Sequence, residues 1–318
     1  MDLSFIIVSW NTRSLLLDCL RSLQETVRGF SYEIFVVDNG SEDGSPEAVR
    51  REFGPSVNLI ANSCNRGFAR ANNQALRRAK GTCVVLLNSD TVLRQNTVSG
   101  LIGFLEANPA AAMAGPRMVG GDGELQNSYD NFPGLLTELL NKSLLRMLFP
   151  RTYAGKNAQA TEPFEVDSLI GACLAVRSEA IRRVGVFDED YFFFLEETDW
   201  CLRMRKAGWK IFHLPGVTVV HLQGQSKRHR PALAWVEYYR SLYLFFKKNR
   251  SAASYILLRV CRFIKLIINL LLTVLGLACT LGLRERYRRK TGVYAALLWW
   301  HLRLCPQAVG LRGHGLQK

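Results

Sequence analysis

Several common signatures are missing from this sequence of 318 residues. It contains no Cys-x-x-Cys pair, no Gly-x-x-x-x-Gly-Lys and no Gly-x-Gly-x-x-Gly, so neither a zinc ribbon nor a triphosphate or dinucleotide loop is expected. Its eight cysteines are scattered and several lie in apolar runs, which favours reduced core thiols in a protein facing the cytosol over a disulfide framework. No basic leader precedes the first apolar run, which ends by Trp10, so no secretory signal is expected.

Acidic residues are scarce in the last part of the chain. Residues 226–318 contain 18 Lys and Arg but only two acids, Glu237 and Glu285, whereas residues 1–225 are nearly balanced with 23 basic and 25 acidic side chains. A hydrophobic content of 48% is typical of a globular protein, and the net charge of +14 predicts an anionic partner. The basic residues bracket an uncharged run rather than alternate with polar residues along a groove, so nucleic acid is not the expected partner.

The uncharged run covers residues 266–283. As a helix it would be about 27 Å long, just short of the ~30 Å hydrocarbon core of a bilayer. Positive charge on both flanks gives no preferred orientation, so a single span is not favoured over a helix in the headgroup layer or a re-entrant hairpin with residues 293–300. We therefore expect residues 231–318 to associate with an anionic membrane surface on its cytoplasmic face. The alternative is a buried helix with a solvated basic face.

Strand-like and helix-like segments alternate over the first 90 residues. Strands are predicted at 3–9, 33–37, 57–60 and 83–87, with helices over 14–25, from 46 and over 69–80. This alternation is typical of an α/β fold with a mostly parallel, Rossmann-like sheet and helices on both faces. Residues 120–164 are interpreted as a long active-site excursion with one helix at 135–148. Later elements are predicted as strands at 166–169, 173–177, 210–213 and 217–221, a helix from 178, and an acidic region at 188–199 that runs into a helix.

Polar residues follow the predicted strands, at the edge where parallel sheets bind ligands. They are Ser9, Trp10, Asn11, Asp38, Asn39, Asn65, Arg66, Gly67, Asn88, Ser89 and Asp90. Turn chemistry alone explains any one of these groups, but four groups at one sheet edge favour a binding site. A carboxylate after a buried strand, as at Asp90, suits a hard divalent cation held against a diphosphate. His221 ends a later predicted strand and is a second candidate ligand, although a lone histidine is more often structural.

Three carboxylates, Glu196, Glu197 and Asp199, follow the aromatic run at 191–194. Neighbouring carboxylates raise one another's pKa, so one of them suits a general base near neutral pH. Asp199 lies four residues before Arg203 on a predicted helix, and a plain ion pair is an open alternative for it. Glu197 is less easily explained by a structural role.

Seven motifs stand in order between residues 3 and 226. They are Val8-Ser9-Trp10-Asn11, Val37-Asp38-Asn39-Gly40-Ser41, Asn65-Arg66-Gly67-Phe68 followed by Asn72-Asn73, Leu87-Asn88-Ser89-Asp90-Thr91, Gly171-Ala172-Cys173, Phe194-Leu195-Glu196-Glu197-Thr198-Asp199, and Arg203 with Gly208. This series resembles the inverting family 2 glycosyltransferases, most of all their bacterial rhamnosyltransferase-like branch.

The resemblance implies a GT-A fold and a division of labour along the chain. Residues 1–118 would form the nucleotide-sugar-binding half and residues 119–230 the acceptor-binding, catalytic half of one domain, with residues 231–318 as a helical membrane-associating tail. Asp38 would contact the nucleobase of the donor, and Asn11 would lie near the nucleotide. Asp90 matches the last acid of the Asp-x-Asp metal motif and His221 the late histidine that completes the metal shell in some members, so Mg²⁺ or Mn²⁺ is the implied cofactor.

Two departures from the family pattern bear on these roles. Asn88 replaces the first acid of the metal motif, so a single carboxylate would hold the cation. Glu196-Glu197 replaces the usual Glu-Asp pair, which leaves the base assignment between neighbours, with Glu197 at the catalytic position.

The implied reaction moves a sugar, with dTDP-rhamnose as the candidate donor, onto a hydroxyl of a lipid-linked or other cell-envelope glycan with inversion. A sugar nucleotidyltransferase would need a Gly-rich triphosphate loop that residues 8–12 do not offer, and it stays an alternative together with a non-catalytic membrane-associated scaffold. The sequence leaves the oligomeric state open.

Overall fold

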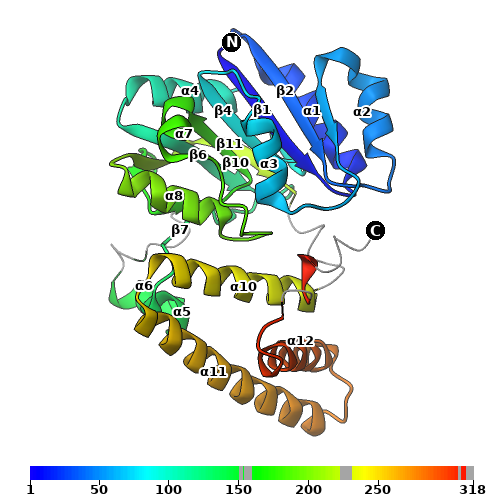
Figure 1. Cartoon of the computed structure of the whole chain (residues 1–318), viewed down its shortest axis with the longest axis vertical. Helices are drawn as coiled ribbons and strands as arrows, with labels where there is room; N and C mark the ends of the chain where they lie inside the picture. Colours follow the sequence, from blue (N-terminus) through cyan, green and yellow to red (C-terminus); the bar gives the residue numbers. More distant parts are fainter. Residues whose placement is uncertain (150–152, 154–159, 223–230, 307–308, 313–318) are drawn as a thin grey trace.

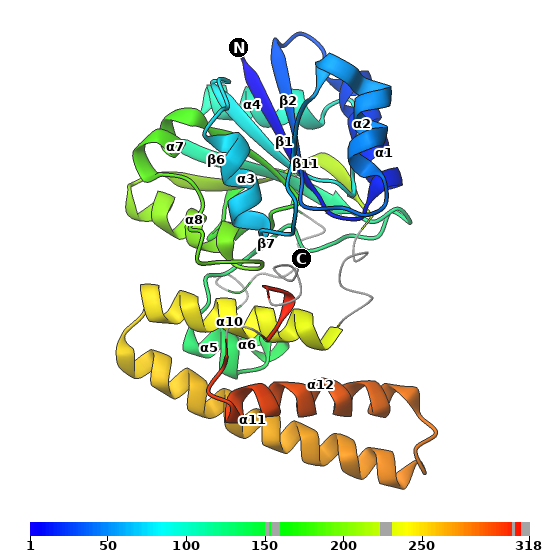
Figure 2. The ribbon, with the colours of Figure 1, turned by 45° about the vertical axis from the view of Figure 1, so that its right-hand side comes forward.

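The computed structural model describes residues 1–149, 153, 160–222, 231–306 and 309–312. A twisted sheet flanked by helices forms one part of the molecule, and a group of helices lies along one side of it (Figures 1 and 2). We call residues 1–134 and 160–222 the sheet half. The described residues of 135–149 and 231–312 are the helical half.

The first four strands and the helices between them form where the sequence predicts them. They are β1 (Leu3–Ser9), α1 (Arg13–Thr26), β2 (Tyr32–Asp38), α2 (Ser45–Phe53), the short 3₁₀ helix η1 (Gly54–Ser56), β3 (Asn58–Ala61), α3 (Phe68–Leu76) and β4 (Cys83–Asn88). The strands are apolar almost throughout because both of their faces are covered: Phe5 and Ile7 enter the hydrophobic cluster on one face of the sheet, and Ile6 enters the cluster on the other.

The strand order of the main sheet is β3-β2-β1-β4-β10-β6-β11-β5, with β8 also paired to β11. Strands β1 to β4 run parallel to one another, and β6 runs parallel to β11. Strand β10 runs antiparallel between β4 and β6, and β5 and β8 run antiparallel to β11. The later strands are β5 (Thr91–Leu93), β6 (Ala111–Val119), β8 (Phe164–Glu165), β10 (Cys173–Arg177) and β11 (Lys210–His221), and β7 (Tyr129–Asp130) pairs with β9 (Ser168–Leu169) in a separate two-stranded sheet. The predicted α/β architecture with a mostly parallel sheet is confirmed.

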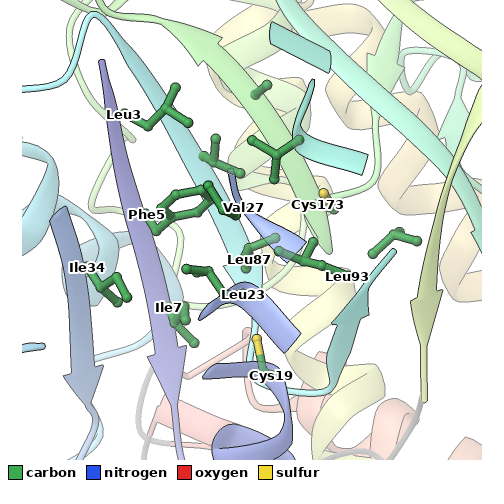
Figure 3. Close-up of a cluster of buried hydrophobic side chains, with 14 of the residues drawn as sticks. Leu3, Phe5, Ile7, Cys19, Leu23, Val27, Ile34, Leu87, Leu93 and Cys173 are labelled. Carbon is green, nitrogen blue, oxygen red and sulfur yellow. The ribbon is translucent and has the colours of Figure 1, made fainter. Parts of the chain in front are cut away.

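Helices cover both faces of the sheet. Helix α1, α2 and α4 (Thr97–Ala107) pack on one face, and α3, α7 (Ser178–Val184) and α8 (Glu196–Lys206) pack on the other. Figure 3 shows the first of these clusters, where Phe5 and Ile7 of β1 meet Leu23 of α1. The sheet half therefore has a closed core on each side of the strands.

The cysteines confirm the expected chemistry in part. All eight are free, and Cys19, Cys83, Cys173 and Cys201 are buried. Burial raises the pKa of the Cys19 thiol to about 12, so this side chain is an inert core thiol. Cys279 lies exposed near the end of a helix in the helical half, so the prediction that the cysteines are core residues is wrong there.

Three predicted elements differ in detail. The two strands expected at 210–213 and 217–221 are one strand, β11, whose pairing with β6 shifts register between Leu214 and Thr218. The helix expected at 135–148 is two helices, α5 (Leu135–Leu139) and α6 (Lys142–Leu148), because the Asn141 side chain caps the second by accepting from the Ser143 amide at 2.8 Å. The strand expected at 166–169 is regular only at Ser168–Leu169.

The helical half consists of α5, α6, α10 (Pro231–Asn249), α11 (Ala252–Cys279) and α12 (Glu285–Leu302). Helices α11 and α12 form a hairpin (Figure 2), closely packed where Gly276 faces the Tyr287 ring: a Cβ at that glycine would lie 2.6 Å from a ring carbon. The Arg262 side chain of α11 pairs with Glu138 of α5 in a nearly buried ion pair. The boundary predicted at residue 230 lies outside the described residues.

Helix α10 is bonded directly to the sheet half. The Ser241 hydroxyl donates to the Phe193 carbonyl at 2.8 Å, and the Asn249 amide donates to an Asp199 carboxylate oxygen at 3.0 Å. Tyr191 and Leu202 of the sheet half belong to the same apolar cluster as Phe245 of α10. The helical half is thus attached to both ends of the segment that carries Glu196 and Glu197.

Candidate active site

The polar residues predicted at one sheet edge come together there. Strands β1 and β2 end in register at Ser9 and Asp38, and the Asn39 amide donates to the Ser9 carbonyl at 2.8 Å. A hydroxyl chain links β1 to the end of β4: Ser9 Oγ lies 3.0 Å from Thr12 Oγ1, which lies 2.8 Å from Ser89 Oγ. The carboxyl ends of three parallel strands therefore form one polar surface, as is typical of ligand sites in α/β sheets.

Hydrogen bonds hold one carboxylate oxygen of Asp38, and the other oxygen has none among the described residues. The carboxylate is only 2% exposed, and its Oδ2 accepts the Ser41 amide at 2.9 Å and the Gly40 amide at 3.2 Å. Its Oδ1 is buried and has no hydrogen-bond partner among the described residues. A buried acceptor without a donor costs free energy, so this oxygen is suited to an N–H group that a ligand brings.

The turn after β2 requires its glycine. Gly40 has φ +79°, and a Cβ there would lie 2.8 Å from the Cα of Cys64. The chain after β3 therefore approaches the Asp38 turn so closely that a single side-chain amide can hydrogen-bond across the two segments.

That amide is Asn39, which is 3% exposed. Its Nδ2 donates to Asn65 Oδ1 at 2.9 Å, and its Oδ1 accepts the Arg66 backbone amide at 3.0 Å. Asn65 Oδ1 also accepts the Gly67 amide at 2.9 Å. Both side chains hold the loop in shape, and their predicted contact with a donor stays a prediction.

The remaining residues of this edge lie closer to solvent. Asn11 has φ +53° and accepts the Glu42 amide on its Oδ1 at 2.8 Å, which fixes the loop after β1. Trp10 is 38% exposed and Arg66 is exposed, so an aromatic face and a cation are available beside the polar edge. This combination suits a nucleotide, which presents a base and a diphosphate.

Asp90 and His221 form a pair across the junction of β5 and β11. His221 is the last residue of β11 and pairs in register with Thr91, and the Leu222 amide donates to the Asp90 carbonyl at 2.9 Å. His221 Nε2 lies 3.3 Å from Asp90 Oδ1, and both side chains are largely buried. The two residues that the sequence placed 131 positions apart are therefore neighbours.

Gln126, which the sequence analysis did not single out, contacts this pair. Its Oε1 lies 2.9 Å from His221 Nδ1, and its Nε2 donates to the His221 carbonyl at 2.8 Å. Gln126 sits on the return arm of a tight turn after β6, in which Val119 pairs with Leu125 and the Gly120 amide donates to the Glu124 carbonyl at 2.8 Å. The spacing of residues in the sequence does not predict this contact, because it depends on the turn that brings Gln126 back to His221.

The pair fits a divalent cation. No group of three or more His, Cys, Asp or Glu side chains that could hold a metal occurs in the part of the chain that the structure describes. Two ligands of one octahedral cation stand about 3 Å apart, close to the 3.3 Å between Asp90 Oδ1 and His221 Nε2. Mg²⁺ and Mn²⁺ commonly take few protein ligands and fill the remaining positions with water and substrate phosphates. Asn88, where the family motif has an acid, is half-buried and stands two residues before Asp90.

Glu196 and Glu197 open helix α8 and differ in environment. Glu196 is 3% exposed, whereas Glu197 is half-buried and its side chain lies against Gly171: a Cβ there would stand 3.7 Å from Glu197 Cγ and Cδ. Residue 171 leads into β10, and the Asn88 amide donates to the Ala172 carbonyl at 2.9 Å. Glu197 is therefore next to the strand end that carries Asn88 and Asp90.

The segment before α8 has a strained backbone. Phe194 and Leu195 have φ +73° and +65°, a conformation that costs about 1–2 kcal/mol for a residue other than glycine. The Ser241 bond to the Phe193 carbonyl and an edge-on contact of Phe194 with Tyr238 at 5.8 Å hold it in place. Helix α10 thus stabilises the turn that aims Glu197.

The open alternative for Asp199 is confirmed. Arg203 Nε donates to Asp199 Oδ2 at 2.8 Å, and Asn249 occupies the other oxygen. Asp199 is a structural residue that ties α8 to α10, which leaves Glu197 and Glu196 as the candidates for a base.

Comparison with known proteins agrees with this arrangement. The model of the family described as glycosyl transferase family 2 matches residues 4–185, more than half of the chain. An N-acetylglucosaminyl-diphospho-decaprenol L-rhamnosyltransferase of Mycobacterium tuberculosis is 28% identical over 233 residues, which cover 69% of this chain and 75% of the relative. A dTDP-rhamnosyl transferase of Shigella flexneri is 26% identical over 173 residues, 54% of this chain and 53% of the relative.

The fold has solved counterparts. A mannosyltransferase from Pyrobaculum calidifontis, solved with GDP-Man and Mn²⁺, superposes with a TM-score of 0.58 at 20% identity, over 95% of this chain and 86% of that one. A GalNAc-T7 structure with UDP, GalNAc and Mn²⁺ gives a TM-score of 0.56 at 17% identity, over 78% of this chain and 50% of that one. At such identities the likeness concerns the fold, and the expected GT-A fold is confirmed.

Proposed function

Because this chain belongs to glycosyl transferase family 2 and is a glycosyltransferase, we propose that it transfers a sugar, with inversion, from a nucleoside-diphosphate donor to a hydroxyl of a lipid-linked glycan. The observation that carries this proposal is the placement of Glu197 against Gly171, next to the strand end that bears Asp90 and on the same sheet edge as Asp38. A base, a cation site and a nucleobase acceptor then lie along one edge of the sheet.

Each residue has a separate role in the proposed reaction. Asp38 Oδ1 accepts an N–H of the base, and the exposed Trp10 and Arg66 contact the base and the diphosphate. Asp90 and His221 would hold Mg²⁺ or Mn²⁺, which would supply positive charge for a departing diphosphate. Glu197 removes the proton from the acceptor hydroxyl as that oxygen bonds to the anomeric carbon and the bond to the diphosphate breaks. A single displacement inverts the anomeric centre.

The relatives indicate the donor and acceptor to test first. Both relatives are rhamnosyltransferases by name, one of them using a dTDP donor and the other a decaprenol diphosphate acceptor. We propose dTDP-rhamnose as donor and a polyprenyl-diphosphate-linked glycan as acceptor for this chain.

The helical half supports a membrane location for such an acceptor. Helix α11 has 28 residues, is long and apolar enough to cross a bilayer, and is the only such helix among the described residues. It is mostly exposed: Leu271, Leu272 and Leu275 are 64%, 60% and 61% accessible. Helices α5 and α6 add a second exposed apolar group with Met147 at 71%. Exposed apolar surface of this extent marks an interaction site in a folded protein.

We propose that this surface lies in the headgroup layer of the cytoplasmic leaflet. Arg284, Arg286, Arg288, Arg289 and Lys290 follow the turn of the α11–α12 hairpin, where they can meet anionic lipid. At about 42 Å, α11 is longer than the apolar run within it, and Arg259 and Arg262 belong to its first half. A helix with that charge distribution fits the interface better than the bilayer centre.

A panel of nucleotide sugars tests the proposal. The full chain is incubated with each donor, a polyprenyl-diphosphate-linked acceptor, and Mg²⁺, Mn²⁺ or chelator, and the released nucleotide is identified. Release of dTDP with formation of an inverted glycoside is expected, and chelator should abolish it. In a parallel assay with nucleoside triphosphates and sugar 1-phosphates, release of pyrophosphate would instead indicate a nucleotidyltransferase. No turnover in either assay would favour the scaffold alternative.

A further inference from the structure

We infer that Gln126 is a positioning residue: it fixes the tautomer of His221 so that Nε2 presents a lone pair toward Asp90. The tautomer itself does not depend on the proposed function. Only the role of that lone pair as a metal ligand rests on it. The observation behind it is a two-point contact between one side-chain amide and one histidine.

The orientation of the Gln126 amide is decided by the His221 backbone. A carbonyl oxygen accepts hydrogen bonds and cannot donate, so the Gln126 atom 2.8 Å from the His221 carbonyl must be the NH₂ nitrogen. The amide oxygen then necessarily faces His221 Nδ1, at 2.9 Å.

The amide orientation in turn decides the state of the ring. Because Gln126 Oε1 is an acceptor, Nδ1 must carry the proton. In a neutral imidazole only one ring nitrogen is protonated, so Nε2 is left with its lone pair. A ring protonated only at Nε2 would set two lone pairs against each other at 2.9 Å.

Asp90 acts against this choice. Its Oδ1, 3.3 Å from Nε2, is also an acceptor and by itself would favour the tautomer with the proton on Nε2. In the neutral ring fixed by Gln126, a carboxylate oxygen and an imidazole lone pair face each other without a proton between them. A cation in that space satisfies both, and metal-bound histidines commonly donate their other ring N–H to an oxygen acceptor in this way.

Several hydrogen bonds hold the turn that carries Gln126. The backbone amide of Gln126 donates to the Met118 carbonyl at 3.0 Å, and the backbone amide of Glu124 donates to Asp122 Oδ1 at 3.1 Å. The turn starts directly after β6, which pairs with β11 up to Val119 opposite Val220. Gln126 and His221 are therefore fixed to adjacent strands.

Nitrogen-15 NMR on the unmodified protein, without metal or donor, tests the inference first. At mildly alkaline pH, where imidazole is neutral, the His221 ring should show a protonated Nδ1 and an unprotonated Nε2. The His221 signals are identified by their loss in His221→Gln, and the other four histidines of the chain serve as internal references. A neutral His221 ring protonated at Nε2 overturns the inference, whatever the variants do.

Two substitutions then separate positioning from mere structure. Gln126→Met keeps the size of the side chain but removes both hydrogen bonds, and it should shift the proton to Nε2 and weaken Mn²⁺ binding about 10- to 100-fold, measured by electron paramagnetic resonance. Gln126→Glu keeps an acceptor for Nδ1–H and should retain both the tautomer and the Mn²⁺ affinity. Asn127→Asp adds the same charge one residue away, at an exposed position, and controls for charge alone.

The outcomes distinguish this inference from the proposed function. Wild-type tautomer and Mn²⁺ affinity in Gln126→Met would overturn the inference even if the protein transfers sugar normally. The expected tautomer and affinity changes would support it even if no donor in the panel is turned over, because neither measurement uses a sugar.

Discussion

The two halves of the molecule treat apolar side chains in opposite ways. Of 24 exposed large hydrophobic side chains among the described residues, 22 belong to the helical half, and only Met1 and Trp10 belong to the sheet half. The sheet half buries its apolar residues in one cluster on each face, whereas the helical half has one cluster around Phe245 and Trp300 and leaves the outer side of α11 uncovered. The comparison teaches that the sheet half buries nearly all of its large apolar side chains, whereas the helical half leaves many of them on its surface, which is the surface proposed above to contact lipid.

Substituting the catalytic candidate should give the largest effect and should affect only one half. We expect Glu197→Gln to lower kcat about 10²- to 10⁴-fold, because it removes the general base, while nucleotide binding and vesicle binding stay unchanged. Glu196→Gln is the matched control, since the neighbouring carboxylate is 3% exposed and faces away from solvent. Equal losses in both variants, measured under chemistry-limited conditions, would contradict the assignment to Glu197.

An ion pair in each half should contribute differently to the free energy of unfolding, because the two pairs differ in burial. In the helical half, Arg262 and Glu138 are 13% and 5% exposed, so Arg262→Met leaves a buried carboxylate unpaired and should cost about 3–5 kcal/mol of unfolding free energy. In the sheet half, Arg21 and Glu52 are 47% and 33% exposed, and Arg21→Met should cost less than about 1 kcal/mol.

Urea unfolding of both variants measures the difference. Removing both partners, as Glu138→Leu with Arg262→Met, should restore most of the lost stability, because no uncompensated charge remains. A double variant as unstable as the single one would indicate that the packing of these two side chains, and not their charge, is what matters.

A charge on the outer side of α11 tests the membrane role. Leu271→Glu replaces a side chain that is 64% exposed in water, so the fold should be unaffected. Partitioning onto vesicles that contain anionic lipid should fall about 10- to 100-fold, because a leucine contributes roughly 1.5–3 kcal/mol when buried. Gln95→Glu, an exposed change of the same charge in the sheet half, is the control and should alter partitioning little. Unchanged partitioning of Leu271→Glu would remove α11 from the proposed membrane surface.

A pH titration should show the smallest effect, and it belongs to the sheet half. Burial, with a further contribution from Arg117, lowers the pKa of His213 to about 4. The unfolded chain takes up a proton near pH 6.5 and the folded chain only near pH 4, so stability is fully present above about pH 6.5 and declines as the pH falls toward 4. His213→Asn should reduce this decline by about 1–3 kcal/mol, measured as the difference in unfolding free energy between pH 7 and pH 4.5. A decline of the same size in the variant would assign it to other groups.

The sequence predicts the sheet half well where strands are buried on both faces. Runs such as Phe5-Ile6-Ile7 and Cys83-Val84-Val85 leave no other element that buries every side chain, and β1 and β4 form there. Strand β6 cannot be recognised from the sequence, because Ala111-Ala112-Met113-Ala114-Gly115-Pro116 has low strand propensity. Its pairing with β10 and β11 overrides that weakness. Pro215 and Gly216 interrupt the strand pattern of β11 in the same way, although the chain stays extended through them.

The candidate site shows the same limit. Ser9, Asp38 and Ser89 could be placed at one edge because the end of a parallel strand fixes their position. The contact of Glu197 with Gly171 and that of Gln126 with His221 depend on loops that return to the sheet from other elements, and no local pattern encodes such returns. Asn39 is predicted to contact a ligand from its place after a strand, and its hydrogen bonds show that a loop can occupy the same side-chain amide.

The bonds from α10 to Phe193 and Asp199 have a geometric consequence. They tie the start of α8 to α10, the helix that precedes the α11–α12 hairpin, so a tilt of the hairpin that moves α10 would also move the segment that carries Glu197. If α11 rests on a bilayer, the Glu197 carboxylate stays at a constant height above the lipid plane. The enzyme would then select acceptors by length: only those whose reacting hydroxyl lies at that height above their lipid anchor could be extended.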